Sequence, residues 1–188
     1  MPHRMEPRDD FVERLEGPDR AAALPLDRII PSMSLSSSDT VVDVGSGTGY
    51  FSLPMSRLVR RVVALDLEPK MLRHLSGRVR NEGVENAEPV QADALALPIA
   101  SAAADHVLAA FIYHEVQDPA SLLRECARVL VPSGRLTVID FQKRETAFGP
   151  PLRDRVTPEE VVKAAQGLFA VVSSVDGEVY YQIELAKA

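Results

Sequence analysis

A short apolar run that ends in a glycine-rich turn is the feature that most constrains this chain. Residues 40–49 read Thr-Val-Val-Asp-Val-Gly-Ser-Gly-Thr-Gly, and a helix-like pattern follows them. The β-branched residues before the turn are typical of a parallel strand that is buried on both faces. Alternating glycines remove Cβ atoms where the chain turns sharply, so a ligand can approach the backbone. The segment therefore predicts a strand, a cofactor-binding loop and a helix.

The glycine spacing matches the dinucleotide fingerprint only in part. G-x-G-x-x-G requires glycine at position 50, where this chain has Tyr50, and the observed spacing is G-x-G-x-G. Such a turn can also serve strand-to-helix packing alone. Asp43 lies just before the loop, where a carboxylate would repel a phosphate and attract an amine or a sulfonium. The sequence therefore favours a cofactor that carries positive charge and no phosphate.

Length, charge and cysteine content limit the function classes. With 188 residues the chain corresponds to one domain, with little room for the separate substrate domain of a typical dehydrogenase. The net charge of −6 argues against a general nucleic-acid binder. Cys126 is the single cysteine, so no internal disulfide or cysteine-based metal cluster can form, and the histidines show no metal-ligand spacing. Neither a secretory signal nor an apolar run of membrane length is apparent, so we expect a cytoplasmic protein.

Strand-like and helix-like segments alternate through the chain. Residues 8–31 predict one or two short helices, and further strands are expected at 61–67, 86–92, 105–112 and 135–141. Thr157-Pro158-Glu159-Glu160 is a capping box that begins a predicted helix ending near Gln166. Two last strands, 169–175 and 178–185, form a predicted hairpin. This alternation predicts an α/β fold closed by an antiparallel pair.

Two further carboxylates follow predicted strands. Asp66 lies 21 residues after Gly45, where an acidic residue would meet ribose hydroxyls; the alternative is a helix-capping or solvated carboxylate. Asp93 follows the third strand and could accept a hydrogen bond from an adenine amine; the alternative is an ordinary turn residue. Carboxyl ends of parallel strands meet at one edge of a sheet, so we expect these side chains to gather there with Asp43.

With these residues in place, the sequence resembles the class I S-adenosylmethionine-dependent methyltransferases, in particular the small-molecule, methyltransferase-11-like group. The resemblance covers roughly residues 38–141. It implies a Rossmann-like, doubly wound seven-stranded sheet, mostly parallel with an antiparallel last strand. It also implies a single methyltransferase domain, with an N-terminal helical leader (1–37), a cofactor-binding core (38–141) and a variable loop, helix and closing hairpin (142–188). The matching segments are 42–49, 64–72, 91–94, 111–116 and 130–136.

The resemblance also implies roles for individual residues. The glycine loop would hold the methionine portion of S-adenosylmethionine, with Asp43 near its ammonium group. Asp66 would bind both ribose hydroxyls, with Leu67 against the adenine. The remaining expected cofactor contacts are Gly45, Ser46, Gly47, Thr48, Gly49, Asp93, Ala94 and Phe111.

The acceptor side is less defined by sequence. We expect methyl transfer to a small molecule by in-line attack, with His114 as the candidate general base; its alternative role is to shape the pocket. Tyr113 is a further candidate at the acceptor site. Arg153 and Arg155 could bind an anionic substrate or be solvated loop charges. No Asn-Pro-Pro-Tyr-type motif follows the fourth strand, so no nucleic-acid acceptor is expected.

Two other function classes remain open at the level of sequence. One is an NAD-binding oxidoreductase or epimerase, against which Tyr50, Asp43 and the chain length argue. The other is a non-catalytic cofactor-binding regulator with the methyltransferase fold. The oligomeric state, the acceptor atom and a lid role for the leader are not defined by the sequence.

Overall fold

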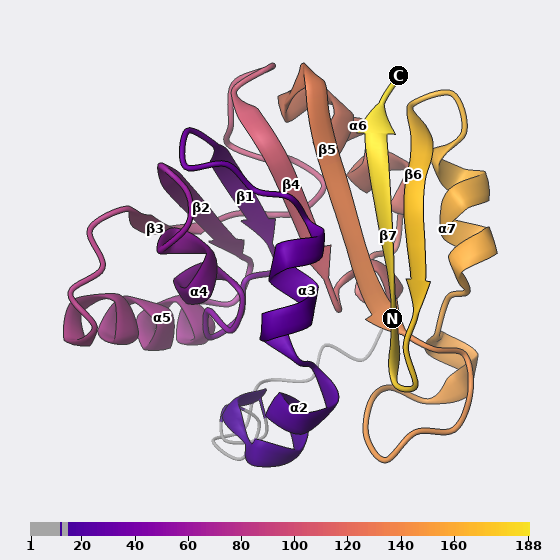
Figure 1. The fold of residues 1–188 in the computed structure, drawn as a ribbon, viewed down its shortest axis with the longest axis horizontal. Coiled ribbons are helices and arrows are strands. Elements are labelled where there is room, and N and C mark those ends of the chain that lie inside the picture. The colour runs from indigo at the N-terminus through magenta and orange to yellow at the C-terminus, as the bar shows by residue number, and fades with distance from the viewer. Residues whose placement is uncertain (1–11, 13–14) are drawn as a thin grey trace.

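A single seven-stranded sheet with helices on both faces forms the molecule (Figure 1). The computed structural model describes residue 12 and residues 15–188. The strands are β1 (Thr40–Val44), β2 (Arg61–Asp66), β3 (Ala87–Gln91), β4 (Ala104–Ala110), β5 (Leu130–Phe141), β6 (Phe169–Asp176) and β7 (Tyr180–Lys187). The helices are α2 (Pro18–Ala23), α3 (Leu26–Ser32), α4 (Ser52–Ser56), α5 (Pro69–Asn81), α6 (Pro119–Val129) and α7 (Pro158–Ala165), with short 3-10 turns η1 (Tyr113–Glu115) and η2 (Leu152–Asp154).

The order of the strands places the switch point of the sheet, where the winding direction changes, beside the glycine loop. The sheet runs β3-β2-β1-β4-β5-β7-β6, so the chain winds outward from β1 in one direction and from β4 in the other. β1 pairs in parallel with both β2 and β4. In open α/β sheets ligands bind at the carboxyl ends of the strands where the winding direction changes. That position is the end of β1, where the glycine loop begins.

The sheet buries two apolar layers, one on each face. Val42 and Val44 of β1 pack into the core that α6 and α7 cover, whereas Val41 packs into the core shared with α3 and α4. Figure 1 shows α3 and α6 on opposite sides of the sheet. Both faces of β1 are therefore buried, as its β-branched sequence predicts.

The end of the chain forms as the sequence predicts. Thr157 caps α7 with a capping box, in which its side chain accepts from the N–H of Glu160 and Glu160 accepts from the N–H of Thr157. β6 and β7 pair in an antiparallel hairpin, and β7 inserts between β5 and β6. β7 is also antiparallel to β5, so the reversed last strand and the doubly wound fold class are both confirmed.

Two predicted boundaries differ from the structure. The leader contains two short helices within residues 18–32, since Pro25 begins α3 and cannot continue α2; the segment before residue 12 lies outside the described residues. β5 begins at Leu130 instead of residue 135, because Leu130 already pairs with Ala104 before the register shifts. Pro132, Ser133 and Gly134 therefore lie inside β5, in the part where its register with β4 shifts.

Among the described residues, no helix combines the length and apolar character that a membrane span requires.

Candidate functional site

Three aspartates meet at the carboxyl edge of the sheet, as the sequence predicts. Asp43 lies near the end of β1, Asp66 ends β2, and Asp93 follows β3. The N–H of Ala92 donates to the carbonyl of Asp66 at 3.0 Å, which joins the exit of β3 to the end of β2. We call these aspartates and the loop 45–49 the carboxyl rim. The rim concentrates negative charge beside backbone that is not part of a strand.

Asp43 is the deepest of the three. Its side chain is buried and accepts a hydrogen bond from Ser52 Oγ, the first residue of α4, at 2.5 Å. Burial raises the pKa of Asp43 to about 7, an effect that the Ser52 hydrogen bond opposes and the charge of Asp66 reinforces. Because burial disfavours the charged form of this carboxylate, a cation placed nearby would stabilise it. This is the position at which the sequence favours a positively charged ligand.

Asp66 connects the glycine loop to the second strand. Its Oδ2 accepts from the N–H of Gly47 at 2.7 Å, and its Oδ1 accepts from the N–H of Glu68 at 2.8 Å. Burial raises the pKa of Asp66, although these backbone N–H groups pull it down. The carboxylate is half-buried, so it remains within reach of a ligand at the loop. Such an acceptor suits a diol, as in the predicted ribose role.

The three glycines of the loop serve different purposes. A Cβ at Gly45 would lie 2.6 Å from Ile112 Cδ1, and one at Gly49 would collide with Leu75 Cδ1, so both glycines are required by packing within the protein. Among the described residues, a Cβ at Gly47 would meet only Leu15, at 3.9 Å, so these residues leave space beside its backbone. Gly47 also has φ +55°, a conformation that glycine adopts without steric cost. It is the glycine at which a ligand can contact the main chain.

The loop also holds polar side chains with no partner. Ser46 Oγ and Thr48 Oγ1 are buried and form no hydrogen bond with any residue that the structure describes. Buried hydroxyls are normally paired, and exceptions are concentrated at functional sites. Together with the open backbone at Gly47, they fit a polar ligand such as the methionine portion of S-adenosylmethionine.

The predicted adenine contacts lie at the outer end of the rim. Leu67 is 44% exposed, an unusual state for a large apolar side chain directly after a buried strand. Gln91 Nε2 donates to the carbonyl of Leu67 at 3.2 Å. Asp93 is exposed, and its Oδ1 accepts from the N–H of Leu95 at 2.9 Å, while Ala94 is half-buried beside it. An apolar side chain next to hydrogen-bond acceptors suits a flat base, and these contacts remain predictions.

Phe111 begins an aromatic cluster at the end of β4. Its φ is +59°, a strained conformation for a bulky residue, and its N–H donates to the carbonyl of Ile139 at 2.7 Å. Its ring lies 6.5 Å from that of Phe51 and 4.7 Å from that of Phe141, measured between centroids. Phe141 in turn contacts the ring of His114 at 5.8 Å. The aromatic cluster therefore runs from Phe51, directly before α4, to His114, the candidate base.

His114 is held by a partner that sequence reasoning missed. Its Nδ1 lies 2.7 Å from Asp140 Oδ1, and its backbone N–H donates to Asp140 Oδ2 at 3.1 Å. Asp140 is buried near the end of β5. A polar residue inside the apolar run 136–141 was the signal that could have indicated it. With Nδ1 directed to a carboxylate, Nε2 is the nitrogen left to accept a proton.

The environment of His114 raises its pKa overall. Burial alone would lower the pKa, but the hydrogen bond and charge of Asp140, with the charge of Glu115, outweigh burial and the opposing charge of Arg155. Nε2 lies 3.7 Å from Glu115 Oε1. The imidazole is thus poised to hold a proton that it has taken up.

The three residues predicted for the acceptor do not form one binding surface. Tyr113 is buried in the core, and its burial raises the pKa of its hydroxyl to about 12. Arg155 is also buried: it donates to the carbonyls of Pro150, Gln142 and Arg144, which favours a role in shaping the loop 142–155. Arg153 is 82% exposed beside Asp154, as expected for a solvated loop charge.

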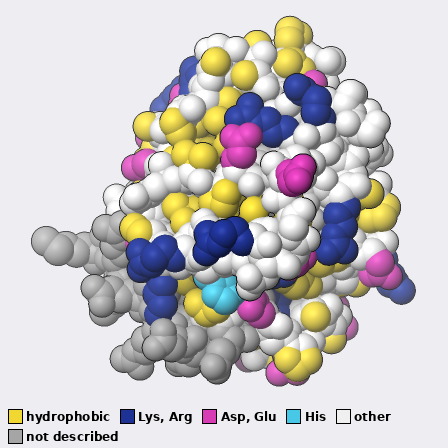
Figure 2. All heavy atoms as spheres, turned by 90° about the vertical axis from the view of Figure 1, so that its left-hand side faces the viewer, with side chains coloured by type: hydrophobic (Ala, Val, Ile, Leu, Met, Phe, Trp, Pro, Cys, Tyr) yellow, Lys and Arg dark blue, Asp and Glu magenta, His cyan; other side chains and the backbone are white. Residues whose placement is uncertain are grey.

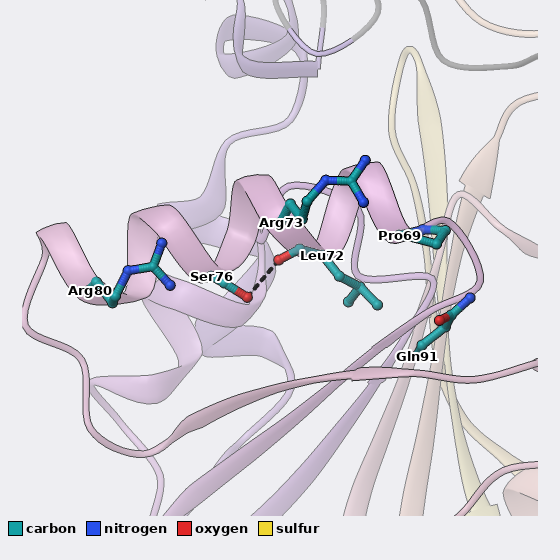
Figure 3. Close-up of a pocket in the computed structure, with 6 residues that line it drawn as sticks. All are labelled: Pro69, Leu72, Arg73, Ser76, Arg80 and Gln91. Carbon is teal, nitrogen blue, oxygen red and sulfur yellow. Dashed lines mark hydrogen bonds between the residues drawn. The ribbon is translucent and has the colours of Figure 1, made fainter.

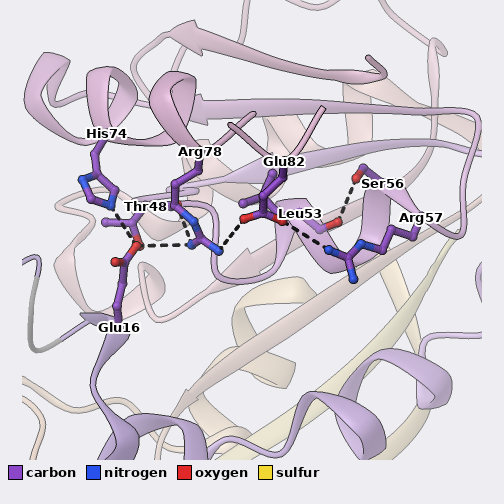
Figure 4. A network of polar contacts seen from close by, with 8 residues as sticks. All are labelled: Glu16, Thr48, Leu53, Ser56, Arg57, His74, Arg78 and Glu82. Atoms are coloured by element: carbon purple, nitrogen blue, oxygen red, sulfur yellow. Dashed lines mark hydrogen bonds and ion pairs between the residues drawn. The ribbon is translucent and has the colours of Figure 1, made fainter. Parts of the chain in front are cut away.

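The leader is tied to the rim by a polar network (Figure 4). Glu16 Oε1 contacts His74 Nε2 at 2.9 Å and Arg78 Nη1 at 3.2 Å, both on α5. Arg78 Nη1 also donates to the carbonyl of Thr48 in the glycine loop at 3.2 Å. Tyr50 Oη donates to the carbonyl of Leu24 at 2.9 Å. The leader therefore lies against the loop, as a cover of the cofactor site would.

An open depression along α5 adjoins the outer end of the rim at Gln91. It is bordered by Pro69, Leu72, Arg73, Ser76, Arg80 and Gln91, and none of the rim aspartates borders it (Figure 3). On the face that Figure 2 shows, basic and acidic side chains are interspersed. Within the described part of the chain, no cluster of His, Cys, Asp and Glu could hold a metal ion.

Comparisons with known proteins identify the family of the chain. A family model described as a methyltransferase domain matches residues 42–138. The ubiquinone/menaquinone biosynthesis C-methyltransferase UbiE of Klebsiella pneumoniae is 42% identical over 108 residues, which make up 55% of this chain and 43% of that protein. A UbiE protein of Escherichia coli is 41% identical over the same shares. The chain thus spans less than half the length of these curated relatives.

Solved structures support the same fold. An S-adenosylmethionine-dependent methyltransferase from Aquifex aeolicus has a TM-score of 0.87 at 24% identity, covering 95% of this chain and 98% of its own. The Bacillus subtilis protein YcgJ has a TM-score of 0.60 at 28% identity, over 62% of this chain and 50% of its own. The [4+2]-cyclase SpnF shares the fold at 19% identity and a TM-score of 0.78, over 89% of this chain and 82% of its own. Because the family model covers the glycine loop and the first five strands, the chain belongs to the class I S-adenosylmethionine-dependent methyltransferases, whose cofactor is S-adenosylmethionine.

Proposed function

We propose that this chain transfers a methyl group from S-adenosylmethionine to a small-molecule acceptor. The observation that carries the proposal is the placement of Asp66, whose carboxylate bonds the N–H of Gly47 in the loop that the family uses for its cofactor. The unpaired hydroxyls of Ser46 and Thr48 add donors at the same place. The nearby buried carboxylate of Asp43 favours a ligand of positive charge.

The residues of the chain would divide the work between binding and proton transfer. The bound cofactor supplies an electrophilic methyl group on a positively charged sulfur. The glycine loop and Asp66 fix the position of that group, and positioning alone accounts for a large part of the rate of such reactions. An acceptor that carries a proton on its attacking atom must lose it, and Nε2 of His114 receives it. Asp140 keeps Nε2 free for this step and stabilises the charge that develops on the imidazole.

The acceptor class is inferred from the relatives. The UbiE proteins are named as C-methyltransferases of quinone biosynthesis, so a carbon acceptor activated by a neighbouring hydroxyl belongs in the first set to be tested. For such an acceptor, His114 would remove the hydroxyl proton.

Ligand binding tests the proposal directly. Isothermal titration calorimetry with S-adenosylmethionine, S-adenosylhomocysteine and NAD should show binding of both sulfur compounds and none of NAD. Binding of NAD alone would replace the proposal by the oxidoreductase alternative. A panel of phenols, amines and carbon acids, assayed by release of S-adenosylhomocysteine, then identifies the acceptor. Tight cofactor binding with no turnover of any acceptor would favour the regulator.

The Asp66→Ala variant gives a sharper measurement. We expect the affinity for S-adenosylhomocysteine to fall about tenfold to a hundredfold, the loss typical of hydrogen bonds to a charged group. Glu88→Ala is the matched control, because Glu88 is an exposed carboxylate on neighbouring β3 whose ion pair with Arg61 lies away from the rim. Calorimetric Kd values for both variants check the prediction. Equal affinities would show that Asp66 does not bind the ribose.

A further inference from the structure

Arg20 on α2 carries a positive charge that forms no ion pair with the described residues. Its guanidinium carbon lies 5.2 Å from the ring centroid of Tyr50 and 5.4 Å from that of Phe111. Its Nε is buried and has no hydrogen-bond partner in the described part of the chain. No carboxylate among the described residues forms an ion pair with it. Tyr50 directly follows the glycine loop and Phe111 follows β4, so the guanidinium lies between the segments that leave β1 and β4 at the switch point of the sheet.

Burial of an unpaired guanidinium is costly for the protein alone. The desolvation is large enough that the pKa of Arg20 is lowered to about 10, even for a group that is normally always charged. Two aromatic faces offset part of this cost, but they offer no acceptor to the N–H groups. A buried donor without a partner is expected where a ligand supplies the acceptor.

The surrounding charge indicates which ligand group belongs there. The rim otherwise presents Asp43, Asp66 and Asp93, and Glu115 lies next to His114. This negative charge attracts the sulfonium and the ammonium of the cofactor and repels its α-carboxylate. Arg20 is a cation that lies over the aromatic rings of Tyr50 and Phe111 at the glycine-loop end of this edge of the sheet. The α-carboxylate is present on every bound cofactor molecule, whereas the charge of the acceptor is a separate unknown.

We propose that Arg20 binds the α-carboxylate of the methionine portion of the cofactor, with Nε and a terminal N–H group forming a fork to its two oxygens. This inference rests on the proposed function, because it assigns one end of the same cofactor. A guanidinium matches a carboxylate in plane and in spacing, which a lysine ammonium does not. The leader would then contribute directly to the cofactor site, and ligands without the amino-acid end would bind less tightly.

The test compares two ligands on four proteins. S-adenosylhomocysteine carries the α-carboxylate, and 5′-methylthioadenosine shares its adenosine and neutral sulfur but lacks the amino-acid end. The proteins are the wild type, Arg20→Met, Arg20→Lys and the control Arg28→Met, whose guanidinium is exposed on adjacent α3. By calorimetry, Arg20→Met should weaken S-adenosylhomocysteine about tenfold or more and leave 5′-methylthioadenosine unchanged. Arg20→Lys should fall between the wild type and Arg20→Met, and Arg28→Met should match the wild type.

Three results would overturn the inference. S-adenosylhomocysteine could bind Arg20→Met as tightly as the wild type, or both ligands could weaken equally, which would indicate altered packing. A variant that binds the cofactor normally but raises only the KM of an anionic acceptor would assign the charge to the acceptor instead. Thermal unfolding monitors folding, and Arg20→Met should be no less stable than the wild type, since it removes a desolvated charge. Loss of the proposed function is read separately, as failure of the wild type to bind S-adenosylhomocysteine at all.

Discussion

The two ends of the sheet satisfy their polar groups to very different degrees. At the amino ends of the strands, the N–H of Thr40 donates to Asp105 Oδ2 at 2.8 Å, and Thr40 Oγ1 accepts from Arg60 Nη2 at 2.6 Å. Buried Glu184 is paired with Arg135 at 2.6 Å. At the carboxyl ends, by contrast, Ser46 and Thr48 of the rim and Arg20 of α2 each keep a buried polar atom that pairs with none of the described residues. Buried polar groups are thus paired at the amino ends of the strands, whereas several at the carboxyl ends have no partner among the described residues. This difference is expected where a bound ligand supplies the missing hydrogen bonds.

The same contrast is visible in the two buried histidines associated with β4. His106 lies toward the start of the strand, and its Nε2 is 2.8 Å from Thr137 Oγ1, a neutral partner. Burial and the charge of Arg135 lower the pKa of His106 to about 4. His114 lies beyond the other end and has a carboxylate partner, which raises its pKa. His106 in β4 is therefore kept neutral in the folded protein, whereas His114, beyond the end of β4, holds a proton more readily than an ordinary histidine.

The largest expected effect concerns His114. For the acceptor that the panel identifies, His114→Ala should lower kcat about 100- to 10,000-fold, the usual range for loss of a general base. The affinity for S-adenosylhomocysteine should not change, because the imidazole lies on the acceptor side. Both quantities come from S-adenosylhomocysteine release and calorimetry. An unchanged kcat would assign His114 a role in pocket shape alone.

The pH profile sharpens this prediction. The proposed general base must be neutral before it can accept a proton, so kcat/KM should rise with pH up to the pKa of His114. Asp140 raises the pKa, hence Asp140→Asn should move this acid limb to lower pH. His114→Ala should lack the limb. A limb that stays in place in both variants would contradict proton transfer to this histidine.

A smaller effect is expected at His106, and it concerns stability. The pKa of His106 is about 4 in the folded protein, below the ordinary value of 6.5 expected in the unfolded chain. Folding therefore favours the neutral imidazole. The resulting stability is present above pH 6.5 and is lost as the pH falls toward 4. Between pH 7 and pH 5 the wild type should lose about 2 kcal/mol more than His106→Gln, which cannot titrate. Urea unfolding at both pH values measures this difference, and parallel losses would contradict it.

The sequence predicted the rim better than the acceptor side for a physical reason. Asp43, the glycines and Asp66 follow one another along consecutive strand ends, so parallel pairing alone brings them together. The partnership of His114 with Asp140 joins residues 26 positions apart through the pairing of β4 with β5, and no local pattern encodes it. Arg155 illustrates the opposite error, because a loop arginine in sequence became a buried donor to loop carbonyls. Local patterning defines strand ends, whereas tertiary packing decides which side chains between them meet.

The smallest expected effect lies at the amino end of the sheet, at the ion pair of Arg61 with Glu88. Both side chains are about half exposed, at 47% and 48%, and Arg61 Nη2 lies 2.6 Å from Glu88 Oε2. Exposed pairs of this kind contribute little, because water and salt screen them, so Arg61→Ala should cost under about 1 kcal/mol of unfolding free energy. Its affinity for S-adenosylhomocysteine should equal that of the wild type, since the pair belongs to the satisfied end of the sheet. Urea unfolding and calorimetry measure the two quantities. A loss of cofactor affinity in this variant would mean that the two ends are coupled through β2, and the division between a stabilising end and a ligand-binding end would no longer hold.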